Sequence, residues 1–185
     1  MKNTACIVIT FLVLLASMVA SPHAAFAREI EAGSAARLTF GQIQRDERID
    51  TLRAYLLKHN SPLTDEASHF IAEADRLGLD WKLVAAIAGT ESTFGIHVPA
   101  GSYNAWGWGI PTGAQSGIAF GSWRQGIPTV SEGLKERYIN RGATSIEKIG
   151  RIYAASPRWA GNVRFFLNRI EEFIPSDPAL LAVTL

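Results

Sequence analysis

The sequence predicts a mainly α-helical single domain, and two observations lead to this prediction. Apolar residues recur at helical spacing in several segments between residues 44 and 174, and typical helix-start and helix-end residues separate these segments. Residues 92–131 differ, because they contain eight glycines and no aspartate or glutamate, a composition that disfavours a regular helix. We therefore expect a helical domain with a Gly/Trp-rich loop, or a short β-hairpin lobe, inserted after its central helix.

Residues 1–27 are predicted to be a signal peptide rather than part of this domain. Lys2 supplies a positive start, an apolar run follows, and Ala25 and Ala27 form the small-residue pattern of a cleavage site. The apolar run is too short for a spanning helix, which needs about 20 residues. We expect cleavage after Ala27, secretion to the periplasm or the extracellular space, and a flexible lead-in over residues 28–43.

Cleavage at this place removes the only cysteine and one charge. Cys6 lies inside the signal segment, so we expect neither a disulfide framework nor a lipid anchor in the mature chain. The full sequence has 18 basic and 17 acidic residues, and the loss of Lys2 balances them. This balance argues against a nucleic-acid-binding protein. We expect a monomer without a stable membrane anchor.

Three helices are predicted in the first half of the domain, which spans residues 44–174. The first covers residues 44–58, where apolar residues form one stripe, and HNSPL ends it. Thr64 is the predicted N-cap of the second helix, and Gly78 its terminator. The third helix, WKLVAAIA and the residues that follow, is expected to be capped by Asp80 and to end near Gly95.

Helical signals return after the glycine-rich segment. The sequence TVSE has the pattern of a capping box that starts at Thr129, with Glu132 at its third helical position. Further helices are expected over residues 145–154 and 162–174. The C-terminal tail, residues 175–185, is apolar and is expected to fold back on the core.

The third helix raises a question of function, because its apolar face ends in a carboxylate. Val84, Ile87 and Ala88 occupy this face, and Glu91 is the next residue on it. Partial burial and the negative end of the helix dipole both raise the pKa of a carboxyl group at such a place. A carboxyl that stays protonated near neutral pH suits a general acid. The alternative is a structural glutamate whose side chain reaches solvent or a neighbouring backbone group.

The segment after Glu91 suggests a carbohydrate partner. Trp106 and Trp108 lie two residues apart between glycines in NAWGWG, where two indoles are difficult to bury together, and sugar rings pack on exposed aromatic faces. His59, His69 and His97 lack the spacing of metal ligands, and we expect no metal and no cofactor.

Three motifs, AIAGTESTFG, SYNAWGWG and RIYAASPRW, follow one another in an order that resembles the lysozyme-like superfamily of bacterial wall-cleaving enzymes. The resemblance is strongest to the endo-β-N-acetylglucosaminidase branch (mannosyl-glycoprotein endo-β-N-acetylglucosaminidase-like domains). It covers roughly residues 62–174. Lytic transglycosylases and goose-type lysozymes resemble the chain less.

The resemblance implies a lysozyme-like fold and a role for six residues. Glu91 is the implied catalytic acid, and Tyr153 the implied tyrosine that faces it. The implied substrate-binding residues are Ser92, Asn104, Trp106 and Trp108. The implied activity is that of a secreted, wall-associated glycosidase that cleaves β-1,4 bonds between amino sugars, with peptidoglycan glycan strands as its partner.

One departure from the family leaves the chemistry open. Some members of the branch have a second carboxylate after the catalytic helix, whereas residues 92–131 contain none, and the expected capping role explains Glu132. A single acid is compatible with attack by the substrate's own N-acetyl group, or with a lytic transglycosylase that leaves an anhydro end. A non-catalytic peptidoglycan- or chitooligosaccharide-binding accessory protein is the alternative from a different class.

Overall fold

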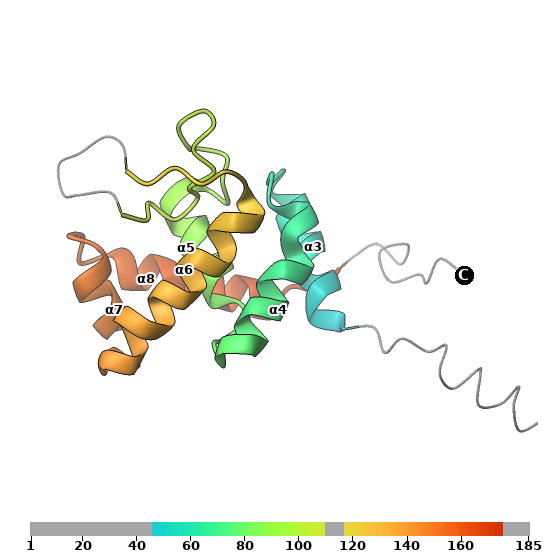
Figure 1. Cartoon of the computed structure of the whole chain (residues 1–185). Helices are drawn as coiled ribbons and strands as arrows, with labels where there is room; N and C mark the ends of the chain where they lie inside the picture. The colour runs from blue at the N-terminus through green and yellow to red at the C-terminus, as the bar shows by residue number, and fades with distance from the viewer. Residues whose placement is uncertain (1–45, 110–116, 176–185) are drawn as a thin grey trace, which may run out of the picture. The chain divides into compact units, whose positions relative to one another are not determined.

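The computed structural model describes residues 46–109 and 117–175, which all belong to one compact unit, and within these ranges it is mainly helical without β-strands (Figure 1). The mainly α class is therefore confirmed. A hairpin around residues 116–123 is not formed in the part that is described, from residue 117 on. The predicted signal peptide, the lead-in and most of the tail lie outside the described residues. None of the helices described here is long and apolar enough to cross a membrane.

The helices follow one another with short connections until the segment after the central helix. In chain order they are α3 (Glu47–Lys58), the 3-10 turn η2 (Thr64–Glu66), α4 (Ala67–Leu77), α5 (Leu83–Ser92), α6 (Trp123–Arg137), the 3-10 turn η3 (Ile139–Arg141), α7 (Ile146–Tyr153) and α8 (Trp159–Glu171).

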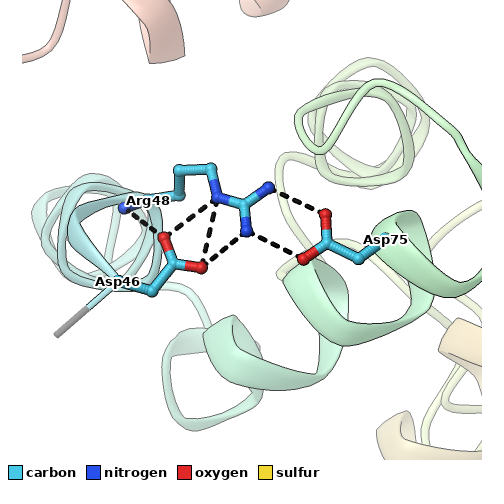
Figure 2. Close-up of polar contacts among 3 residues, drawn as sticks. All are labelled: Asp46, Arg48 and Asp75. Atoms are coloured by element: carbon cyan, nitrogen blue, oxygen red, sulfur yellow. Dashed lines mark hydrogen bonds and ion pairs between the residues drawn. The ribbon is translucent and has the colours of Figure 1, made fainter. Parts of the chain in front are cut away.

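The first helix starts three residues later than its apolar stripe suggests, because Asp46 caps it. The Asp46 carboxylate accepts a hydrogen bond from the backbone N–H of Arg48 at 3.0 Å. Figure 2 shows the Arg48 guanidinium between this carboxylate and that of Asp75 on α4, with two 2.8 Å hydrogen bonds to Asp75. The arginine thus ties the start of α3 to α4.

The end of α4 follows its sequence signal, whereas the starts of α4 and α5 do not. Gly78 takes the left-handed conformation that ends α4, with φ of 62°, as predicted. Asp80 was expected to cap α5, but the helix begins at Leu83 with Lys82 as its N-cap, and the Asp80 carboxylate accepts a hydrogen bond from the Lys82 N–H at 3.0 Å in the turn before the helix. Thr64 is not an N-cap, because its hydroxyl donates to the Ser61 carbonyl at 2.7 Å inside a 3-10 turn.

The prediction for α6 is wrong at its start. The helix begins at Trp123, where the Ser122 side chain accepts a hydrogen bond from the Gln125 N–H at 3.2 Å, and it continues through Pro128. Glu132 therefore lies inside the helix and caps nothing. Its carboxylate makes an ion pair with Arg76 of α4, at 2.7 Å.

The central helix α5 is buried almost all round. It packs against α8 and α6 (Figure 1), and its residues from Leu83 to Gly89 are all buried. Four of these seven residues are alanine or glycine, so neighbouring side chains can approach the helix closely. The consequence for function is that α5 is a fixed support whose C-terminal end presents Glu91.

Candidate active site

The turn after Glu91 has an unusual backbone. Thr93, Phe94 and Gly95 all have positive φ, of 52°, 58° and 84°, so α5 ends at Ser92 rather than near Gly95. The left-handed conformation costs roughly 1–2 kcal/mol for a non-glycine residue. Such strain persists only where the surroundings hold it, and it is frequent at active sites.

Two contacts hold this turn in place. The Phe94 side chain is fully buried, and its ring meets those of Tyr55 and Phe166 edge-on, at centroid distances of 5.6 and 5.0 Å. The Phe94 carbonyl accepts a hydrogen bond from the buried Ser61 hydroxyl at 2.7 Å. These contacts come from segments on either side of α5 in the sequence, so the packed domain fixes the end of the helix.

Ser92, an expected substrate-binding residue, is buried and serves the backbone. Its hydroxyl lies 2.7 Å from the carbonyl oxygen of Ala105 and 3.1 Å from that of Ala88, and it accepts a hydrogen bond from the Gly95 N–H at 2.9 Å. The side chain ties the end of α5 to the loop around residue 105. This arrangement favours a structural role over direct contact with a sugar.

Glu91 is exposed, and its carboxylate is held by an indole. Its Oε1 accepts a hydrogen bond of 2.6 Å from the Nε1–H of Trp159, 68 residues further along the chain. Burial raises the pKa of the Glu91 carboxyl, and the indole hydrogen bond opposes this rise. One side of the glutamate is open to solvent, but its neighbours withdraw enough water to raise its pKa above the ordinary value of a glutamate. The direction of the shift is the one expected from the sequence, with burial as its first cause.

Tyr153 lies near Glu91, but its hydroxyl is directed to the backbone rather than to the carboxylate. It donates a hydrogen bond to the backbone carbonyl of Trp106 at 2.6 Å. Its ring stacks on Trp159 with centroids 4.9 Å apart and planes 25° apart. Burial raises the pKa of Tyr153, and the negative charge of Glu91 raises it further, which places the two groups within electrostatic reach. The structure thus brings Glu91, Tyr153 and Trp159 together.

Asn104 organises the loop and has no free side-chain atom for a ligand. Its Oδ1 accepts hydrogen bonds from the N–H groups of Trp108 at 2.9 Å and Trp106 at 3.3 Å. Its Nδ2 donates to the carbonyls of Trp108 and Ile118, at 2.9 and 2.8 Å. The side chain is 6% exposed. The expectation that Asn104 binds substrate is not supported by this geometry.

The expectation that Trp106 and Trp108 form an exposed sugar platform is wrong. Trp106 is 0% exposed and Trp108 7% exposed. The Trp106 indole N–H donates to the Val84 carbonyl of α5 at 2.9 Å. The space for both rings comes from glycines on α6: a Cβ at Gly126 would lie 2.7 Å from the Trp106 ring, and one at Gly133 would overlap the Trp108 ring.

The residue that sequence reasoning missed is Trp159. It stands in the RIYAASPRW motif, but only the tyrosine of that motif was expected at the site. The motif could have indicated this residue, because Trp159 is its terminal aromatic position. In the structure Trp159 starts α8 and donates a hydrogen bond to Glu91. Glu132, the first acidic residue after Glu91 in the sequence, pairs with Arg76 instead of capping a helix.

The described residues contain no group of three or more histidine, cysteine, aspartate or glutamate side chains able to hold a metal ion. Neither a scan against known protein families nor a search of curated protein sequences found a match. The geometry of the Glu91 site therefore carries the functional argument.

Proposed function

We propose that the chain is a secreted glycosidase that cleaves β-1,4 bonds between amino sugars of peptidoglycan, with Glu91 as the general acid and a lysozyme-like fold of the endo-β-N-acetylglucosaminidase type. One observation carries the proposal. An accessible carboxyl with a raised pKa stands at the end of a buried helix, and a fixed indole donor holds it. A structural glutamate at a helix end needs neither the raised pKa nor the donor.

The proposed reaction begins with transfer of the Glu91 proton to the glycosidic oxygen. The bond between this oxygen and the sugar C1 breaks, and its electron pair goes to the leaving oxygen. Residues 92–131 contain no carboxylate, and Glu132 is paired with Arg76, so the proposed mechanism takes the nucleophile at C1 from the substrate itself. The N-acetyl carbonyl oxygen is such a group. Its attack forms a bond to C1. Water then attacks C1 and breaks this bond, whose electron pair returns to the acetamide group, while the water gives a proton to the Glu91 carboxylate and restores the acid.

The products of purified peptidoglycan, analysed by mass spectrometry, test the proposal. A reducing N-acetylglucosamine end supports the glucosaminidase assignment, and a reducing N-acetylmuramic acid end indicates a muramidase. An anhydro end indicates a lytic transglycosylase, in which a hydroxyl of the sugar replaces water. The absence of any cleavage favours the non-catalytic binding protein.

A matched variant separates the acid from the binding surface. Glu91→Gln keeps the shape of the side chain but lacks a comparable acidic proton, so turnover is expected to fall by about 100-fold or more. Folding, checked by circular dichroism, and sedimentation with insoluble peptidoglycan are expected to stay unchanged. Unaltered turnover removes Glu91 from the mechanism.

A further inference from the structure

We propose that Trp159 is a positioning residue that selects which oxygen of Glu91 delivers the proton: the indole occupies Oε1 and leaves Oε2 to carry the acidic hydrogen. This inference rests on the proposed function and specifies how its acid is presented.

The first step of the argument is the hydrogen-bonding capacity of the two groups. An indole N–H is a donor only, so the oxygen that it contacts must offer a lone pair. A protonated carboxyl has one O–H and one carbonyl oxygen, and the carbonyl oxygen is the better acceptor. At 2.6 Å the Nε1–H of Trp159 engages Oε1, so in the acid form the hydrogen belongs on Oε2.

The second step is that the indole is fixed independently of Glu91. Trp159 is 4% exposed, and its ring stacks on Tyr153. Gly150 of α7 leaves room for the ring, since a Cβ there would lie 2.9 Å from it. The Tyr153 hydroxyl is in turn tied to the Trp106 carbonyl. The donor position is therefore set by α7, α8 and the loop of Trp106, and the glutamate side chain adapts to it.

The third step concerns the proton affinity of Glu91. A hydrogen bond donated to a carboxylate stabilises its charged form, so the indole lowers a pKa that burial raises. Tyr153 of α7 is the titratable group that is electrostatically coupled to the carboxyl, and it is neutral over the working pH range because its own pKa is raised. Two opposing effects therefore set the pKa of Glu91: burial raises it and the indole hydrogen bond lowers it. Removal of the indole N–H leaves burial alone, so the pKa rises.

The test follows the indole resonances of the full mature chain by 1H–15N NMR, without substrate. The Trp159 Nε1–H signal, assigned by its loss in Trp159→Phe, is expected to shift with pH as Glu91 titrates, above the ordinary range of a carboxyl group. In Glu91→Gln the same signal is expected to stay flat. The comparison is made between the wild-type chain and Glu91→Gln, and Trp159→Phe serves only to assign the signal. A flat signal in the wild-type protein overturns the inference.

Activity supplies the second readout. A general acid loses activity as pH rises through its pKa, so Trp159→Phe is expected to move the alkaline limb of the kcat profile to higher pH. The kcat itself is expected to fall about tenfold, the effect of one hydrogen bond to a charged group, with KM little changed. Trp81→Phe, which makes the same replacement at a partly buried tryptophan outside the site, is the control and is expected to leave the profile unchanged.

The outcomes distinguish the two proposals. A Trp159→Phe profile that can be superimposed on the wild-type profile overturns the positioning role while cleavage by the wild-type protein still supports the proposed function. A wild-type indole signal that titrates, without cleavage of any glycan, overturns the proposed function, and with it the delivery of the proton from Oε2.

Discussion

At the scale of single residues, the surroundings of Glu91 oppose the charge that its carboxyl group would carry. An ionised carboxylate at this place is partly deprived of water, and within the described part of the chain its hydrogen bond comes from a neutral indole rather than from a cation. Groups in such surroundings are frequent where a protein uses proton transfer. Stability and function then make opposite demands on one residue.

This conflict predicts a pH-dependent stability difference. Because the folded-state pKa of Glu91 is raised, its contribution to stability is fully present below the unfolded-state pKa of about 4.3 and is lost as pH rises through the folded-state pKa. Gln does not ionise. Glu91→Gln is therefore expected to unfold at nearly the wild-type temperature near pH 4 and at a higher temperature near pH 8. Thermal unfolding at both pH values measures this, and a difference that is the same at both contradicts the assigned cause.

At the scale of elements, α6 decides where the tryptophans lie. The sequence shows two closely spaced indoles between glycines, but the glycines that make room for them are Gly126 and Gly133, on a helix that begins 15 residues after Trp108. Sequence spacing gives no sign that these positions are in contact. In addition, Pro128 and Gly126 disfavour helix, so the first turns of α6 were not predicted. Small residues on one face of a helix leave room for aromatic rings to pack against it. The sequence does not reveal this role until the packed rings are known.

A pair of glycine substitutions tests this role of α6. Gly133→Ala places a methyl group where the Trp108 ring lies and is expected to destabilise the protein by about 1–3 kcal/mol. Gly161→Ala is the matched control, because no atom lies near a Cβ at this exposed position of α8; there alanine is expected to be neutral or to stabilise by up to about 1 kcal/mol. Urea unfolding of both variants gives the two free energies, and equal values refute the packing explanation.

At the scale of the whole molecule, much of the fold could be predicted and much of the site could not. Helices α3, α4, α5, α7 and α8 were expected within a few residues of their bounds, because apolar spacing and turn residues are local signals. The position of Glu91 at the end of a buried helix was also predicted from a local signal, the apolar face of that helix. The contact between Glu91 and Trp159 joins residues 68 positions apart, and spacing carries no information about it. The burial of Asn104, Trp106 and Trp108 likewise depends on packing.

The burial of the loop tryptophans predicts a large effect on the stability of the entire domain. Trp108→Ala is expected to lower the free energy of unfolding by about 3–5 kcal/mol, a large part of the roughly 5–15 kcal/mol typical of a domain. An exposed sugar platform predicts instead a loss of ligand affinity with little change in stability. Chemical unfolding, run beside a titration with a chitin oligomer, measures both quantities, and unchanged stability with weaker binding contradicts the core assignment.

The hydrogen bond between Trp159 and Glu91 has an optical consequence. Trp106, Trp108 and Trp159 are shielded from water, so the native emission of the protein should be blue-shifted and should move to longer wavelength on unfolding. Among these three, Trp159 is the one with its N–H on an ionisable group. Carboxyl groups in the acid form quench indole emission more strongly than carboxylates do. The intensity of the native protein at fixed wavelength should therefore fall as pH is lowered through the Glu91 transition, which makes the chain its own fluorescent indicator of the state of its acid.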